Sequence, residues 1–461
     1  MNIVYDKVKL PQVHENYLPV NRSKETMEAH DRKVLKKMAE WDLDALLIYC
    51  DREHGANFAY LTGFETRFEE SVLVLHRDGN CYLMLGNENL KMAKYSLIPA
   101  KVVHVPHFSL PHQPMETAKT LDELFMEAGI GKGMKLGFAG WKLFTSSLED
   151  NKTLLDAPAF MVDALRRVNE GGTIINAAGI FLDAEQGLRH FCNANEIAHF
   201  EYGAGLASSR VMAALNAVAP GKTELELADL LSACGQPLTV TTICATGERF
   251  TDAVVFPRNK KVELGDKISI TLGLRGGLTS RAAYAVSKRE ELPTEVQDYV
   301  EKAAIPYYRA AVTWYETVGI GVCCGDLYDT IEAVLPKADY GWSLNPGHYT
   351  GQEEWTASPV YPNSSVKLQS GMLLQMDIIP SIPGYGGASA EDGIAIADEA
   401  LRHELQKNYP ETWQRIENRR RYMKEELGIQ LKDEILPLSD LCGYLRPYIL
   451  NHDCALKKAG K

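Results

Sequence analysis

The sequence lacks long apolar runs. None of its 461 residues lies in a window with the length and apolarity needed to cross a bilayer. Residues 1–19 carry scattered charges where a secretory signal would have an apolar block. We therefore expect no membrane association and a cytoplasmic location.

Positive charge is outnumbered, with 49 Lys and Arg against 61 Asp and Glu. The formal net charge is −12, whereas binding to a phosphate backbone needs a concentrated basic surface. One basic cluster, residues 419–421, lies in a helical stretch rich in Glu, and we interpret it as a solvated helix face. The composition therefore argues against nucleic acid as a partner.

Paired cysteine motifs are missing as well. The nine cysteines are odd in number and show no Cys-x-x-Cys spacing. Disulfide scaffolds and zinc sites usually show regular paired spacings, so we expect buried free thiols.

The remaining composition, 45% hydrophobic and 24% charged, is that of a globular chain with two or three domains. Residues 1–172 alternate strands with helices and predict a mixed α/β domain. We expect residues 173–400 to form a second domain. Residues 401–461 are expected to add helices that pack back on the body.

A weak internal repeat runs through the second domain. Residues 220–231 begin a helix with a capping box from Thr223 to Glu226. Residues 321–335 have a similar context, since each segment follows a long helix and precedes strands. The pattern predicts two similar α/β halves that face each other across a cleft.

The most informative stretch is residues 345–393, where three titratable groups stand at strand edges or glycine turns. Asp377 lies inside a run of Met, Leu and Ile, so its carboxylate must lose its charge or meet a partner. His348 and Glu391 are available partners. Alone, each has an ordinary interpretation as a turn histidine, a capped strand end or a hairpin turn. Their spacing suits consecutive strands of one sheet and predicts a shared site.

These segments resemble a known family. Residues 265–266, 345–351, 371–380 and 391–393, in that order after an α/β domain, resemble the creatinase, prolidase, Xaa-Pro aminopeptidase and methionine aminopeptidase superfamily. The resemblance covers nearly the whole chain. It implies an α/β N-terminal domain, an α+β pita-bread domain with pseudo-twofold halves, and a homodimer. Residues 57–70 resemble the segment that leads toward a partner subunit's active site.

The resemblance also implies a ligand set. Metallopeptidases of this group hold two metals with two Asp, one His and two Glu. His348 matches the histidine, Asp377 stands where the first Glu is expected, and Glu391 matches the second Glu.

The aspartates depart from the family pattern. The first falls at Thr271, and the second falls at Ala282, or at Arg281 if one residue has been deleted. A further family histidine is replaced by Trp355. Two divalent ions need several carboxylates, so the loss of two predicts no two-metal centre and no metal cofactor.

Substrate contacts follow from the same comparison. We expect Arg281 to neutralise Asp377 or Glu391, or to bind a substrate carboxylate, with a surface salt bridge as the alternative. Arg67 and Tyr349 are the other expected substrate-binding residues, Arg67 by reaching across a dimer.

Three functions remain open. The first is a metal-independent or metal-poor hydrolase of a carbon–nitrogen bond in a small amide, amidine or Xaa-Pro-like peptide, with His348 as acid and base and with Asp377 and Glu391 orienting water. Within this family, the resemblance offers creatinase as the precedent for hydrolysis without a metal. Residues 245–264, however, hold no histidine to match the catalytic histidine of creatinase. The second is a non-catalytic module that binds peptides or small molecules. The third is a mononuclear metallopeptidase with one divalent metal at the same three residues.

Overall fold

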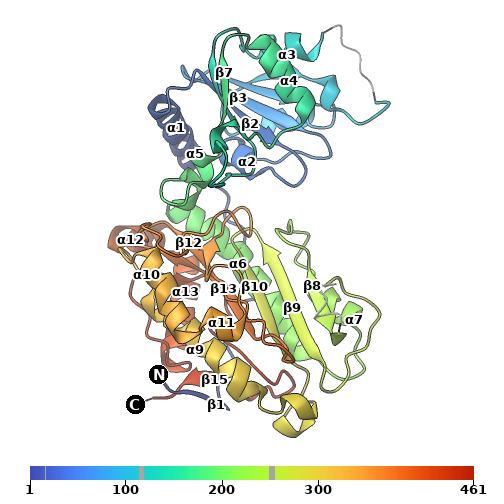
Figure 1. The fold of residues 1–461 in the computed structure, drawn as a ribbon, viewed down its shortest axis with the longest axis vertical. Helices are drawn as coiled ribbons and strands as arrows, with labels where there is room; N and C mark the ends of the chain where they lie inside the picture. The colour runs from blue at the N-terminus through green and yellow to red at the C-terminus, as the bar shows by residue number, and fades with distance from the viewer. Residues whose placement is uncertain (16, 114–118, 249–254, 461) are drawn as a thin grey trace. The chain divides into compact units, whose positions relative to one another are not determined.

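The chain divides into two compact units. One comprises residues 22–190, and the other joins residues 1–21 to residues 191–461. The domain expected over residues 1–172 thus corresponds to the 22–190 unit, and residues 1–21 belong to the other unit. They belong with the C-terminal part because β1 (Ile3–Lys7) pairs antiparallel with β15 (Cys454–Lys458), which brings the two ends of the chain together (Figure 1). The computed structural model describes residues 1–15, 17–113, 119–248 and 255–460.

The 22–190 unit is built on a six-stranded sheet in the order β5-β4-β3-β2-β6-β7. Side chains of β2 alternate between two apolar clusters, with Leu46 and Ile48 in one and Leu47 and Tyr49 in the other. Both faces of this strand are therefore buried. The strands β3 and β4 form an antiparallel hairpin. The elements are α1 (Lys24–Glu40), β2 (Ala45–Cys50), α2 (Ala56–Thr62), β3 (Ser71–His76), β4 (Cys81–Leu85), β5 (Lys101–His104), α3 (Leu121–Glu127), β6 (Lys135–Ala139), α4 (Ala159–Val168), β7 (Thr173–Asn176) and α5 (Gly179–Leu182).

The other unit is built on a sheet with the order β11-β12-β13-β10-β9-β8, and β14 pairs with β13. Figure 1 labels β12, β13, β10, β9 and β8 of this sheet. The first half contributes β8, β9 and β10 to this sheet, and the second half contributes β11, β12 and β13. The two halves join where β10 pairs antiparallel with β13. The elements are α6 (Ala194–Ala217), α7 (Glu224–Asp229), β8 (Ile243–Thr246), β9 (Lys267–Leu274), β10 (Gly277–Tyr284), α9 (Ile305–Thr317), α10 (Cys324–Val334), α11 (Lys337–Tyr340), β11 (His348–Tyr349), β12 (Leu373–Met376), β13 (Ser389–Ile396), α12 (Glu399–Asn408), α13 (Pro410–Glu425) and β14 (Ile435–Pro437).

The two halves of this unit repeat one another, as the sequence predicted. The capping box of α7 is present, with the Thr223 hydroxyl accepting from the backbone of Glu226. Just before α7, Thr223 forms an isolated antiparallel bridge with Lys261, and just before α10, Cys323 forms the same kind of bridge with Lys367. Each bridged lysine precedes a strand of the shared sheet, so the halves share a local design as well as an order of elements.

Other expectations have mixed outcomes. The nine cysteines, all within the described ranges, form no disulfide, and six of them are buried, as expected. The interpretation of residues 419–421 as a solvated face is wrong, because Arg419 and Arg420 are buried and Arg419 pairs with Glu201 and Asp440. Within the described ranges, no helix combines the length and apolarity that a membrane crossing requires.

Candidate active site

One row of side chains crosses the large sheet. Thr271 on β9 lies directly opposite Ser280 on β10, and Ser280 lies directly opposite Glu391 on β13. Side chains of directly opposed residues lie on the same face of an antiparallel sheet. The row therefore carries a hydroxyl, a second hydroxyl and then a carboxylate toward one side.

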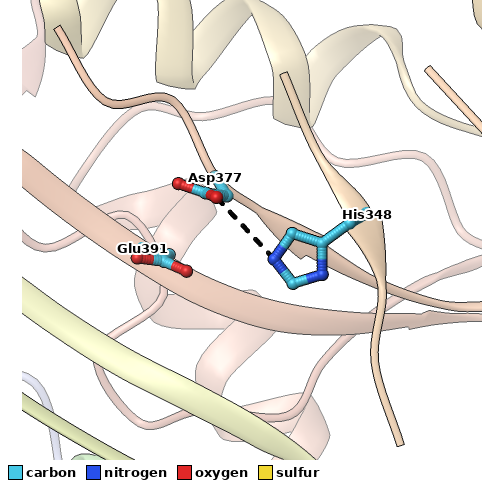
Figure 2. A group of neighbouring side chains, drawn as sticks. All are labelled: His348, Asp377 and Glu391. Carbon is cyan, nitrogen blue, oxygen red and sulfur yellow. Dashed lines mark ion pairs between the residues drawn. The ribbon is translucent and has the colours of Figure 1, made fainter. Parts of the chain in front are cut away.

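The neighbouring strands extend this row. Met376, the last residue of β12, pairs with Asp392, so the next residue, Asp377, comes beside Glu391 on the same face. His348 on β11 pairs with Gln375, two residues before Asp377 and hence on that face too. Figure 2 shows the three side chains pointing toward one another from three adjacent segments of the sheet.

The three groups form a compact, buried cluster. One ligand atom from each of His348, Asp377 and Glu391 lies within 4.8 Å of the others. The Nε2 atom of His348 is 3.7 Å from Asp377 Oδ2. Their exposed fractions are only 1%, 6% and 8%. The shared site predicted from the sequence is thus present in the structure.

Glu354 is a fourth member that the sequence reasoning missed. Its Oε1 atom lies 3.2 Å from His348 Nε2, and its side chain is 18% exposed. It lies in the bend after β11, where no periodic pattern fixes the direction of a side chain. The only available signal was a pair of glutamates a few residues after the glycine-flanked histidine.

The orientation of the imidazole is set by the backbone. The Nδ1 atom of His348 lies 3.1 Å from the Tyr349 carbonyl oxygen. If Nδ1 donates to this carbonyl, Nε2 of the neutral ring presents its lone pair to the carboxylates. This arrangement is typical of a histidine that binds a metal or exchanges a proton through Nε2.

The electrostatics reflect an excess of negative charge. Burial first, and then the neighbouring carboxylates, raise the pKa of Glu391 well above its ordinary value. Burial also raises the pKa of Asp377, to about 6, although His348 opposes the change. For His348, burial alone would lower the pKa, but Glu354 and Asp377 outweigh it and the pKa is raised. The site therefore favours bound protons or a cation.

Arg281 does not supply that cation, and the expectation that it would neutralise or anchor at the site is wrong. Its Nη2 atom donates to Asp392 Oδ2 at 2.5 Å, and Nε and Nη2 also donate to the carbonyls of Tyr444 and Leu441. Its Nη1 atom donates to two further carbonyls. The physical reason is alternation: Arg281 follows Ser280 and so faces the opposite side of the sheet.

The same rule corrects Tyr349. It follows His348 on β11, is fully buried, and its hydroxyl lies 3.6 Å from Met372 Sδ. It therefore does not contact substrate. Trp355, at 53% exposed, lies beside the site with its ring centre 5.9 Å from that of His348. Arg67 is exposed in the 22–190 unit, and its expected role stays a prediction.

The structure also shows which side chains lie at the end of the row where the resemblance placed the family aspartates. Thr271 Oγ1 and Ser280 Oγ lie 2.6 Å apart and form a hydrogen bond. Ser280, rather than Ala282 or Arg281, is therefore the residue that meets Thr271 beside Glu391. Two neutral hydroxyls that bond to each other occupy this end of the row.

The comparisons with known proteins agree with this architecture. Residues 203–398 match metallopeptidase family M24, and residues 32–168 match the creatinase/prolidase N-terminal domain. No curated protein matches the chain in sequence. The chain belongs to the creatinase/prolidase superfamily and has its pita-bread fold.

Several solved structures share this fold. The Xaa-Pro dipeptidase from Bacillus anthracis is 18% identical with a TM-score of 0.61, covering 81% of this chain and 96% of its own. The prolidase from Pyrococcus horikoshii OT3 is 23% identical with a TM-score of 0.61, covering 80% and 95%. The recombinant prolidase from Thermococcus sibiricus is 17% identical with a TM-score of 0.64, covering 82% and 96%.

Proposed function

We propose that the protein hydrolyses a carbon–nitrogen bond in a small amide or a short Xaa-Pro-like peptide, with one divalent cation held by His348, Asp377 and Glu391. One observation carries the proposal. An imidazole and two carboxylates meet in a buried cluster within 4.8 Å, while Arg281 faces the other side of the sheet. One imidazole and two carboxylates are a competent ligand set for zinc, manganese or iron.

The residues fit one cation. Asp377 Oδ1 is buried and has no hydrogen-bond partner among the described residues. The raised pKa values of Asp377 and Glu391 express a repulsion that a divalent cation would relieve. A second ion would need carboxylates where Thr271 and Ser280 offer only hydroxyls. The cluster therefore suits one divalent cation rather than two.

The chain's own residues supply the remaining chemistry. A bound divalent cation would polarise the scissile carbonyl and make water more acidic. Glu354, at the more exposed edge of the cluster, is placed to take a proton from the attacking water and return it to the leaving nitrogen. Because Asp377 and Glu391 are buried, bulk water has little access to their carboxylates.

A second candidate is metal-independent hydrolysis. It is favoured by the distances of 3.2 Å and 3.7 Å from His348 Nε2 to Glu354 and Asp377, which pair an imidazole with two carboxylates. In this case His348 would itself carry the proton between water and the leaving nitrogen.

One set of measurements separates these functions. Protein purified without chelator is analysed for metal and then assayed on Xaa-Pro dipeptides and small amides, before and after chelation. About one metal per chain and loss of turnover on chelation support the mononuclear hydrolase. Turnover that survives chelation but is lost in His348→Ala supports the second candidate. Tight binding without any turnover would select a non-catalytic module. His403→Ala, an exposed histidine, is the matched control.

We also propose that the protein is a homodimer in which Arg67 of one subunit contacts substrate bound to the other. The motivation is its exposed position in the segment that resembles the family's partner-facing one. Mixing Arg67→Ala and His348→Ala proteins tests this idea, because a mixed dimer would regain one intact site. A monomer in solution would refute it.

A further inference from the structure

Trp355 is a large apolar side chain that stays exposed at the edge of the candidate site. About half of it, 53%, is exposed, and its ring centre lies 5.9 Å from that of His348, which is only 1% exposed. Tryptophan side chains are highly buried on average in folded proteins. A half-exposed aromatic ring beside a buried polar cluster is typical of a surface that a ligand covers.

The bend that carries Trp355 is attached to the sheet. The backbone N–H of Tyr349 donates to the Ala357 carbonyl at 2.8 Å, and the N–H of Thr356 donates to the Tyr349 carbonyl at 3.2 Å. These two bonds hold residues 350–356 against the end of β11. The indole is therefore positioned beside His348 before a ligand binds, which reduces the entropy cost of binding.

Two further apolar side chains are exposed on the segments that carry the polar cluster. Leu344 is 55% exposed and Ile379 is 51% exposed. Residues 340–348 and 375–381 run side by side, with strand pairing at one end and a backbone hydrogen bond at the other. Ile379 follows Asp377 by two residues in this pair of segments. Single exposed apolar residues are common, whereas a group of them beside one polar cluster indicates a binding surface.

The position of Glu354 relates Trp355 to one part of the substrate. Glu354 Oε1 lies 3.2 Å from His348 Nε2, and in the proposed reaction Glu354 returns a proton to the leaving nitrogen. That nitrogen must then come within hydrogen-bond distance of Glu354. The substrate residue that carries the nitrogen therefore lies next to Glu354, and Trp355 is the following residue of the same bend.

We propose that Trp355 is a specificity-determining residue whose ring packs against a bulky apolar side chain on the substrate residue that carries the leaving nitrogen. The inference rests on the proposed hydrolase and names its substrate class, which is short peptides with such a residue directly after the scissile bond. An aromatic side chain suits this position best, because two rings that stack or meet edge to face gain more than their buried area alone provides.

The test compares two probe peptides, Ala-Phe amide and Ala-Ala amide. Binding to the chelated full chain is measured by calorimetry, and turnover is measured with metal-loaded protein. We expect the wild type to prefer Ala-Phe amide by about 10-fold or more in Kd and KM. Trp355→Ala should lose this preference with kcat almost unchanged, because the contact is the same in the ground and transition states.

Two control variants accompany this comparison. Trp355→Phe keeps an aromatic ring and should retain most of the preference. Trp141→Ala removes another exposed tryptophan, in the 22–190 unit, and should behave as the wild type.

The outcomes separate this inference from the proposed function. Binding of Ala-Phe amide that depends on Trp355, without hydrolysis of either peptide, would support the Trp355 contact and select the non-catalytic module. Hydrolysis with equal kcat/KM for the two peptides would support the hydrolase and overturn the role of Trp355. A Trp355→Ala protein with the wild-type preference would overturn it as well, and so would the absence of both binding and turnover in the wild type.

Discussion

Arg281 and Asp392 form a buried ion pair, with Nη2 and Oδ2 2.5 Å apart, on the face of the sheet opposite to Ser280 and Glu391. The hydroxyl groups of Ser439 and Thr279 donate to the other oxygen of Asp392. The guanidinium of Arg281 donates five hydrogen bonds, so all of its N–H groups have acceptors. Neighbouring residues on β10 and β13 therefore have different roles. Those on one face of the sheet form the candidate site, and those on the other face attach the sheet to residues 441–444.

Arg281→Met should therefore reduce stability rather than substrate affinity. It leaves Asp392 buried without its cation, and breaking a buried pair in this way costs about 3–5 kcal/mol. Denaturant titration should show this loss, and Arg281→Met with Asp392→Leu should recover much of it. Arg289→Met, at an exposed pair with Glu301, should change the free energy of unfolding by less than about 1 kcal/mol. A stable Arg281→Met with a raised KM would contradict the assignment.

The site should make the metal-free protein less stable as pH rises. The folded-state pKa of Asp377, about 6, exceeds the value near 3.9 expected in the unfolded chain. Between these two pKa values the folded protein holds a proton that the unfolded chain releases. The resulting contribution to the free energy of unfolding is fully present below about pH 4 and is lost as pH rises through about 6. The raised pKa values of Glu391 and His348 act in the same direction.

The measurement is the free energy of unfolding of chelated protein at about pH 5 and about pH 8. Each pH unit between the two pKa values is worth about 1.4 kcal/mol per group. Asp377→Asn should flatten the dependence, and a divalent cation should restore stability at the higher pH. An Asp377→Asn variant with the wild-type pH dependence would show that the cluster is not its source.

The sequence indicated the meeting of His348, Asp377 and Glu391 because strong local signals place each of them. Every one stands at the edge of an apolar strand, and glycine turns set the direction of the chain. The same reasoning failed for Arg281 and Tyr349. In a strand, a shift of one residue reverses the face of a side chain, and only the pairing register fixes that shift.

Two other features needed information that local patterns do not hold. The pairing of β1 with β15 joins residues more than four hundred positions apart, so nothing near residue 5 announces its partner. Glu354 lies in an irregular bend, where neither a helical nor a strand period applies. The repeat of the two halves, in contrast, was readable because the capping box of α7 depends on residues within one turn.

Glu354→Gln should reduce turnover while leaving metal binding intact. The amide keeps the size of the side chain but cannot accept a proton at neutral pH, so kcat should fall by about 10²–10⁴-fold. Metal content should remain that of the wild type, since Glu354 lies outside the cluster of three ligands. Glu353→Gln, one residue earlier, is the control and should retain most activity. Equal losses in both variants would remove Glu354 from the mechanism.

Gly203→Ala should destabilise the hairpin that carries Thr271 and Ser280. A Cβ atom at position 203 would lie 1.9 Å from the carbonyl oxygen of Arg275, in the turn between β9 and β10. Helix α6 and this turn would have to separate, at a cost of about 1–3 kcal/mol or more. The control is Gly131→Ala, where a Cβ would meet no atom within 4 Å. Equal Tm values for both variants would mean that α6 can move without cost.

Placing carboxylates at the hydroxyl end of the row should create a second metal site. Thr271→Asp with Ser280→Asp would place two carboxylates beside Glu391, where the wild-type hydroxyls lie 2.6 Å apart. These buried negative charges repel one another, so the chelated variant should melt below the wild type. Added zinc or manganese should reverse that loss and raise the metal content from about one to about two per chain, as measured by mass spectrometry. Ser381→Asp, at an exposed position, should stay at one. If the wild type already holds two ions, the hydroxyl pair does not limit the site, and the mononuclear assignment fails.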